Sequence, residues 1–218
     1  TTESLSYFMY LKPKTAKRMH FDVIPKAMDE YQQQLKAFHT QEPAAQLNNP
    51  IFHIHGQNAP KPDMAVSFSM LLNLAAVANA DEKDQLWGFI QRYAPDTSAA
   101  SHPGLDQAAG FAVRYYNDFV KPTKTYRAPS DLERSALQDL RDQLAAYQGP
   151  LDPEQLQSIV FACGRERFEP LRAWFKAIYE VLLGASQGPR FGGFIALYGL
   201  TETVALIDHA LSGGFVKD

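Results

Sequence analysis

The chain has 218 residues, of which 45% are hydrophobic and 21% are charged. This composition is sufficient to bury one or two cores, and it excludes an intrinsically disordered chain, which holds too few apolar residues to fold. The formal net charge of −3 at pH 7 excludes a surface that attracts phosphate as a whole, so any affinity for nucleic acid must come from local clusters of cations.

The chain carries no pattern typical of a membrane span or of secretion. The longest nearly uncharged apolar stretch, residues 64–80, is interrupted by polar side chains and is shorter than the roughly 20 residues that a bilayer requires. The N-terminus lacks the pattern of a signal peptide, and the lone Cys163 cannot form an internal disulfide. We therefore expect a cytoplasmic protein that does not bind a membrane.

The N-terminal part begins within a pattern typical of a helix and then becomes strongly basic. Residues 5–24 carry four cations, and no acidic residue lies between Glu3 and Asp22. Only residues 17–24 and 51–55 alternate in a way that suits strands. Pro25 suits the first turn of a second helix, whose apolar stripe consists of Ala27, Tyr31, Leu35 and Phe38.

A proline-rich loop over residues 41–62 separates this part from the helices that follow, so we place a domain boundary near residue 60. Residues 1–60 then form a small N-terminal segment, and residues 61–218 form a helical domain. The apolar periodicity predicts helices over residues 64–80, between Asp81 as N-cap and Pro95, and over residues 104–120.

The second half has clear helix boundaries. Ser130 and Glu133 form a capping-box pattern, and Asp152 followed by Pro153 begins another helix in the same manner. Further helices are predicted over residues 170–183, 191–198 and 201–211, with Gly199 ending the first of the last two. The sum is an all-α protein, folded as an irregular multi-helix bundle.

No motif indicates catalysis or metal binding. The letters His53-Ile54-His55-Gly56 nearly spell the nucleotide-binding signature HIGH, but the residues that follow cannot start a helix at once, so we expect both imidazoles to bond to backbone in a folded loop. Two histidines without further ligands do not make a zinc site. We expect Cys163 to be a buried small side chain. We therefore predict no catalytic residue and no metal ligand.

The chemistry that the residues favour is recognition of single-stranded RNA, whose bases stack on rings while cations hold the phosphates. Tyr115 is preferred over Tyr116 as an exposed ring, because Tyr116 continues the apolar stripe of its helix. The alternatives are that each basic cluster is a solvated face and that the rings fill helix interfaces. The candidate contacts are Lys12, Lys14, Lys17, Arg18, Arg114, Tyr115, Lys121, Lys124, Arg127, Arg190, Phe191 and Phe194.

Several segments of the chain resemble class I lysyl-tRNA synthetases in an alphaproteobacterial form, and the resemblance runs nearly end to end. It is carried by LSYFMYLKPKTAKRMHFDVI (residues 5–24), IFHIHG (51–56), residues 67–95, residues 112–129 and GPRFGGFIALYG (188–199). It implies that residues 1–60 correspond to the region of that family that contacts the tRNA stem. Residues 61–218 would correspond to the helical cage that binds the anticodon.

The resemblance also implies a division of labour. The parent enzyme would join lysine to tRNA(Lys) using ATP with Mg²⁺, on a catalytic domain that carries the HIGH and KMSKS signatures. Neither signature is present here, and the chain begins Thr1-Thr2 without a preceding strand. We therefore expect a C-terminal fragment that holds no cofactor, is inactive alone, and has tRNA(Lys) and its own catalytic domain as partners, with no affinity for DNA. The alternatives are a non-catalytic helical domain for protein interaction and a stand-alone tRNA-binding module.

Overall fold

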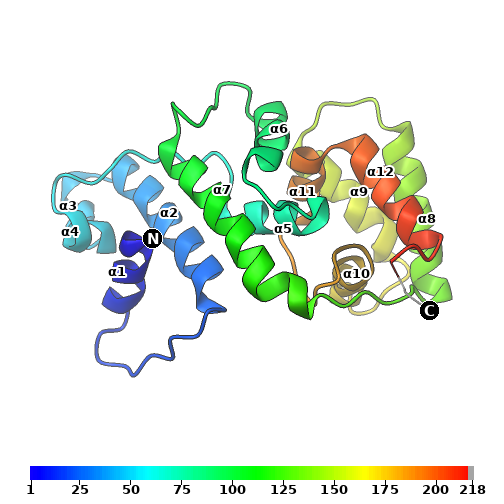
Figure 1. Ribbon diagram of the computed structural model, residues 1–218, viewed down its shortest axis with the longest axis horizontal. Coiled ribbons are helices and arrows are strands. Elements are labelled where there is room, and N and C mark those ends of the chain that lie inside the picture. Colours follow the sequence, from blue (N-terminus) through cyan, green and yellow to red (C-terminus); the bar gives the residue numbers. More distant parts are fainter. Residues whose placement is uncertain (216–218) are drawn as a thin grey trace.

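The computed structural model describes residues 1–215, and all regular structure in that range is helical, which confirms the all-α prediction. Three groups of helices follow one another along the long axis of the molecule (Figure 1). Helices α1 to α4 lie at one end, α5 to α7 in the middle, and α8 to α12 at the other end. Each group has its own cluster of buried apolar side chains.

The first group consists of α1 (Thr2–Tyr10), α2 (Val23–Thr40), α3 (Pro43–Gln46) and α4 (Pro50–His55). The predicted apolar stripe of α2 is confirmed, since all four of its members are buried. The strand-like alternation of residues 51–55 was misleading. Asn49 accepts a hydrogen bond from the backbone N–H of Ile51 and Pro50 takes the first helical position, so a short helix begins there instead.

The middle group consists of α5 (Phe68–Ala78), α6 (Asp84–Tyr93) and α7 (Pro103–Tyr115). Helix α7 continues through a π-helical turn, η1 (Tyr116–Val120), into a short 3₁₀ turn, η2 (Lys121–Thr123). The prediction that Asp81 caps α6 is wrong, because the helix begins three residues later. Instead, the Gln85 side chain accepts hydrogen bonds from the backbone N–H groups of Asp81 and Glu82.

The C-terminal group contains α8 (Asp131–Ala146), α9 (Pro153–Arg165), α10 (Arg172–Ile178), the π-helical turn η3 (Tyr179–Leu183), α11 (Phe191–Tyr198) and α12 (Leu200–Leu211). The capping box at Ser130 and the cap at Asp152 are both confirmed. Helix α11 packs tightly on α9, since a Cβ on Gly192 would lie 2.4 Å from the Pro153 carbonyl. A close helix approach therefore explains this glycine.

Helix α2 joins the first group to the second. Its Met28 is buried in the middle cluster, whereas Tyr31 and Leu35 belong to the first. The Asp29 carboxylate accepts hydrogen bonds from the first backbone N–H groups of α5, at 2.6 Å from Phe68 and 3.1 Å from Ser69. The domain boundary near residue 60 stays a prediction. Helix α2 contributes buried side chains to both the first and the middle cluster.

Within residues 1–215, no single helix is both long and apolar enough to cross a bilayer. The bent pair α11 and α12, with 111° between the two helices, reaches the required length and composition only when both are taken together.

Candidate nucleic-acid interface

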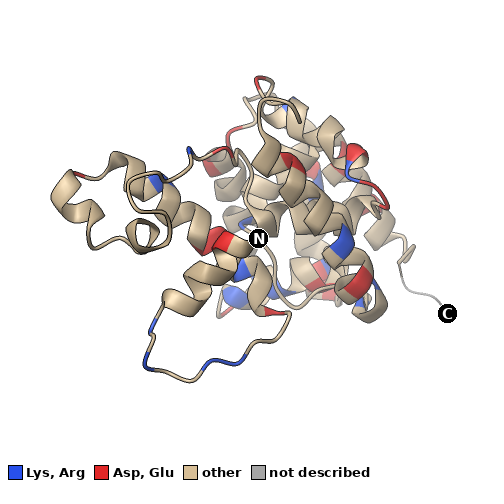
Figure 2. Cartoon of the chain, turned by 60° about the vertical axis from the view of Figure 1, so that its left-hand side comes forward, with Lys and Arg blue, Asp and Glu red and all other residues tan. Residues whose placement is uncertain are grey.

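The basic loop, residues 11–22, joins α1 to α2 and projects as an arc from the first group of helices (Figure 2). Three of its cations, Lys12, Lys14 and Arg18, are exposed to solvent. None of them takes part in the ion pairs of the described residues. Within residues 1–215, the positive charge of these three side chains is therefore not offset by an ion pair.

Lys17 differs from the other cations of the basic loop. Its ammonium donates hydrogen bonds to the carbonyls of Phe8 and Met9 at the C-terminal end of α1, with 2.7 Å to Met9. It also lies 5.2 Å from the centre of the Phe8 ring. A cation at this position satisfies carbonyls that a helix end leaves free and complements the helix dipole. Lys17 thus shapes the loop, and its ammonium is not free to hold a phosphate.

The far end of the basic loop is tethered to the end of α7 by aromatic side chains. The Tyr115 hydroxyl donates a hydrogen bond of 3.1 Å to the Phe21 carbonyl. The Phe21 ring stacks on Phe119, with 4.5 Å between ring centres, and Tyr115 lies 5.1 Å from Phe119 and 6.5 Å from the buried Phe68. These four rings, here named the ring ladder, run from the core to solvent and bring two of the predicted groups together.

Phe21 was not among the candidates from sequence, and it is the most exposed ring of the ladder. The available signal was its place at the end of an acid-free basic stretch. Phe119 was not among those candidates either. Tyr115 itself is half-buried and holds the loop, so its ring is not the exposed platform that the sequence suggested.

A groove begins where the basic loop ends, and we name it the central groove. Its wider part has a volume of about 660 Å³ and lies between α2, α5 and the segment after η3. Its narrower part continues past the end of α7 to residues 123–127. Both parts share Tyr115, Val120 and Ala185, so the two hollows adjoin each other at these residues. Its polar lining includes Asp22, Lys26, Asp29, Glu30, Gln33, Asn73, Thr123, Lys124, Arg127, Glu180 and Gln187.

Both π-helical turns border this groove, η1 through Val120 and η3 through Leu183. Such turns widen a helix locally and occur often at functional sites. The central groove therefore combines amide groups, charges of both signs and irregular helix geometry at one place.

The basic connector, residues 121–130, supplies the second group of candidate cations, and most of these are engaged within the protein. Lys124 donates a 2.5 Å hydrogen bond to the Ala76 carbonyl in the last turn of α5. Its ammonium lies 5.7 Å from the Tyr116 ring centre and 4.9 Å from that of Tyr126. Burial lowers the pKa of Lys124 to about 8. This lysine caps a helix and is poorly placed to bind phosphate.

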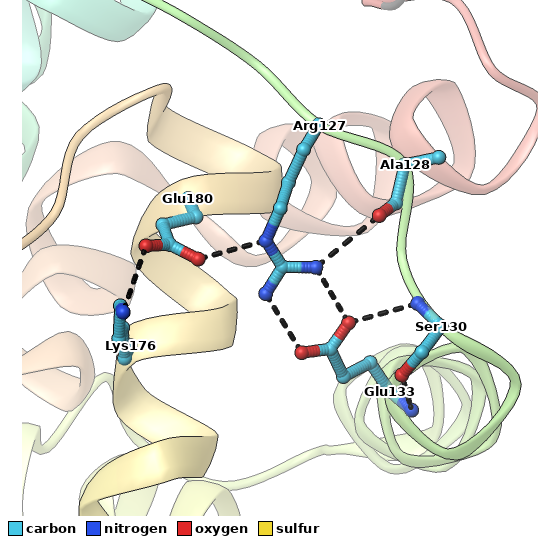
Figure 3. A network of polar contacts seen from close by, with 6 residues as sticks. All are labelled: Arg127, Ala128, Ser130, Glu133, Lys176 and Glu180. Carbon is cyan, nitrogen blue, oxygen red and sulfur yellow. Dashed lines mark hydrogen bonds and ion pairs between the residues drawn. The ribbon is translucent and has the colours of Figure 1, made fainter.

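Arg127 lies at the centre of an ion network (Figure 3). Its guanidinium donates two 2.7 Å hydrogen bonds to Glu133 and one of 2.7 Å to Glu180. Hydrogen bonding from Arg127 is the main cause that lowers the pKa of Glu133 to about 2. The network fastens the basic connector to α8 and η3, so the guanidinium has little donor capacity left for a ligand.

Lys121 and Arg114 remain at the surface beside the ring ladder. Lys121 forms an exposed ion pair of 3.3 Å with Asp81, and such pairs are weak enough to exchange for another anion. Arg114 is exposed, and no ion pair of the described residues includes it. These two cations stay in the candidate interface.

The third predicted group does not fit an interface. Phe191 and Phe194 are fully buried and stack on each other with 5.3 Å between ring centres, so neither ring has a face for a base. The reason is that α11 is apolar on nearly all sides and lies within the C-terminal core. Arg190 is exposed but forms a two-fold ion pair with Glu154, at 2.5 and 2.8 Å. The prediction that these rings stack on RNA is wrong for this structure.

The remaining sequence motifs have structural roles. His53 bonds to the Leu47 carbonyl at 3.0 Å, as expected, whereas His55 bonds to the Tyr31 hydroxyl at 2.9 Å and not to backbone. Cys163 is fully buried, and burial raises the pKa of its thiol to about 12. Among residues 1–215, no three His, Cys, Asp or Glu side chains lie together in a way that could hold a metal ion.

The comparisons with known proteins agree with this arrangement. Residues 1–58 match the family of class I (K) tRNA synthetases. The chain is 71% identical, over all 218 residues, to a lysine–tRNA ligase of Roseobacter denitrificans, of which it covers 41%. It is 45% identical over 212 residues to the lysine–tRNA ligase of Rickettsia bellii and 43% identical to that of Rickettsia felis, covering 96% of this chain and 41% and 40% of those proteins.

The chain is thus similar along its whole length to lysine–tRNA ligases, and its first 58 residues match the class I (K) synthetase family, which confirms the resemblance found in the sequence. It spans about two fifths of the length of the curated relatives that it matches.

Proposed function

We propose that this chain is the tRNA-binding part of a lysine–tRNA ligase. The observation that carries the proposal is the basic loop, which presents Lys12, Lys14 and Arg18 without an ion pair to any described residue and ends at Asp22 in the lining of the central groove. Cations of this kind hold RNA phosphates, while a groove lined by amides can bond to base edges. The relation to lysine–tRNA ligases makes tRNA(Lys) the RNA of choice.

The chain's share of the reaction is to hold the tRNA. Its candidate residues are cations, rings and amides, which bind and orient, and they form no acid–base or nucleophilic arrangement. We propose that lysine, ATP and Mg²⁺ bind to the catalytic domain of the parent enzyme, in the cytoplasm, and that this chain alone is inactive.

We also propose a position for these features along the tRNA. The basic loop would lie on the inner side of the limb that runs from elbow to anticodon. Arg114 and Lys121 would lie nearer the anticodon, and Gln33, Asn73 and Gln187 of the central groove would bond to the edges of its U-rich bases.

The test is binding of lysine tRNA transcripts, with the natural and with altered anticodons, over a series of salt concentrations. We expect a steep salt dependence and weaker binding of the altered transcripts. Equal affinity for both transcripts would remove the anticodon assignment, and absence of binding would remove the proposal as a whole.

One observation favours a second function, a helical domain that binds protein. Lys121, Arg127 and Arg190 are paired with carboxylates, and the net charge of the chain is −3. For that function, tRNA binding would be absent or nearly independent of salt, so the same titration decides between the two.

A further inference from the structure

The outer end of the ring ladder is unusually open to solvent. Phe21 is 62% exposed and Phe119 is 37% exposed, although the two rings stack on each other. Leaving this apolar area in water costs free energy that burial would recover. The backbone of Phe21 is nevertheless held in place by the Tyr115 hydroxyl, and Tyr115 contacts the buried Phe68. The exposed ring is therefore held by the core and not left loose at the tip of a loop.

Beside Phe21 lies an apolar hollow of about 290 Å³, formed by α1, the end of the basic loop and the start of α2. Its lining includes Leu5, Phe8, Met19, His20 and Ile24. This volume is at the lower end of the range for ligand pockets, about 300–1,000 Å³, so it suits one planar ring better than a larger molecule.

The charges around the hollow favour a polyanion. The basic loop contributes exposed Lys14 and Arg18 within seven residues of Phe21, and no acidic residue precedes Asp22 in the loop. Two carboxylates, Asp22 and Asp118, flank the stacked rings in sequence, and Asp22 lines the central groove, whereas the cations of the loop all precede Phe21. A strand whose phosphates follow the basic loop would reach Phe21 before it enters the groove.

We infer that Phe21 and the hollow beside it bind one unpaired nucleobase of the RNA, which stacks on the Phe21 ring while the His20 imidazole bonds to its edge. This inference rests on the proposed function and names a site within it. Stacking on an aromatic ring is tolerant of base identity, because every base has a π face. The site would therefore fix the path of the strand and leave base selection to the central groove.

The experiment uses fluorescence anisotropy with a short single-stranded oligouridylate and with the same backbone made abasic. Phe21→Leu keeps an apolar side chain and removes the ring. We expect it to weaken oligouridylate binding by roughly tenfold, with an unchanged salt slope, because stacking involves no counterion release. Phe21→Trp should restore the affinity. On the abasic strand, the wild type and Phe21→Leu should bind equally.

Phe161→Leu is a matched control, since Phe161 is 41% exposed on α9 in the C-terminal group. It should bind oligouridylate as the wild type does, and thermal unfolding should show both leucine variants folded. If Phe21→Leu binds the oligouridylate as tightly as the wild type, or loses as much affinity for the abasic strand, the base site is overturned.

Failure of this site can be told apart from failure of the proposed function. The double variant Lys14→Glu and Arg18→Glu, measured on the lysine tRNA transcript, reports on the basic loop alone. A loss of tRNA affinity in that variant, with none in Phe21→Leu, removes the base site and leaves tRNA binding in place. No loss in either variant removes both.

Discussion

Two basic segments of this protein look alike in the sequence, yet they differ in the structure. One has four cations and no acid before Asp22, and the other has three cations and no acid. The basic loop (residues 11–22) keeps Lys12, Lys14 and Arg18 at the surface without ionic partners. The basic connector (residues 121–130) has its arginine bound to Glu133 and Glu180, and its half-buried Lys124 bound to the end of α5. In each segment one lysine donates a hydrogen bond to a carbonyl at the C-terminal end of a helix. Lys17 does so at α1 and Lys124 at α5.

The difference teaches that a local run of cations predicts a binding surface only when no distant acid can reach it. The connector passes between two helical groups, where carboxylates from α8 and η3 lie within 3 Å of its arginine. The loop projects away from the helices (Figure 2), so its cations meet mostly water. Ionic partners from elsewhere in the chain thus decide which cations are available to RNA.

The largest effect expected is on RNA affinity when the charges of the basic loop are reversed. The triple variant Lys12→Glu, Lys14→Glu and Arg18→Glu should weaken binding of the lysine tRNA transcript by roughly 100-fold and make the salt slope shallower by about two to three. Its matched control is Arg190→Glu, whose arginine is already paired with Glu154. Comparable losses in both variants would erase the distinction between free and paired cations.

A smaller effect, on stability, is expected from the connector. Arg127→Met leaves Glu133 and Glu180 without their shared partner, and we expect a loss of about 1–2 kcal/mol in the free energy of unfolding, reduced by partial exposure of the ions. Urea denaturation measures it. The tRNA affinity should stay unchanged while the variant is folded. A large loss of tRNA affinity in the folded variant would instead show that Arg127 contributes to the RNA interface.

The same ion network should also make the stability of the protein depend on pH in the acidic range. The pKa of Glu133 is lowered to about 2 from an ordinary value of 4.5, chiefly by hydrogen bonding to Arg127. Below pH 4.5 the unfolded chain takes up a proton that the folded chain refuses, so the stabilisation is complete above 4.5 and is lost as the pH falls towards 2. Glu133→Gln should flatten this part of the stability curve, by less than about 1 kcal/mol given the screening of the group. An unchanged curve would contradict the pairing.

The smallest effect concerns Lys124, whose pKa is lowered by burial and not by an ionic partner. Burial lowers its pKa to about 8 in the folded chain, from 10.5. Between these values the unfolded chain holds a proton that the folded chain has released, so this lysine makes stability rise with pH from 8 towards 10. Above that, Tyr126 and Tyr179, whose pKa values burial raises to about 12, oppose the trend. Lys124→Met should remove this rise in stability when unfolding is followed from pH 7.5 to 10. If the stability of the variant still rises over this range, groups other than Lys124 cause the slope.

Local sequence patterns predicted the helices well where the physical signal was local. The stripe of α2, the capping box at Ser130 and the cap at Asp152 depend on side chains within one or two turns, and all three are present. The misassignments had a non-local or competing cause. Residues 51–55 alternate like a strand, but the cap of Asn49 and the ring of Pro50 favour a helix.

The candidate site was predictable only in part. The basic loop could be recognised from the sequence as a stretch without acids before Asp22, but not its lack of ion pairs within residues 1–215. The burial of Phe191 and Phe194 could not, because it depends on α9 and the other helices that pack around α11. The ring ladder could not be predicted from the sequence either, because Phe21 and Phe119 lie 98 residues apart and come together only in the folded chain.

The sequence by itself determined that this chain is helical, where most of its helices begin and end, and to which family it is related, because helix caps, apolar periodicity and residue identity are properties of neighbouring positions. Only the tertiary structure decided which cations and rings face solvent. Exposure depends on which distant carboxylate or apolar surface covers a side chain, and that is settled by how the three groups of helices pack.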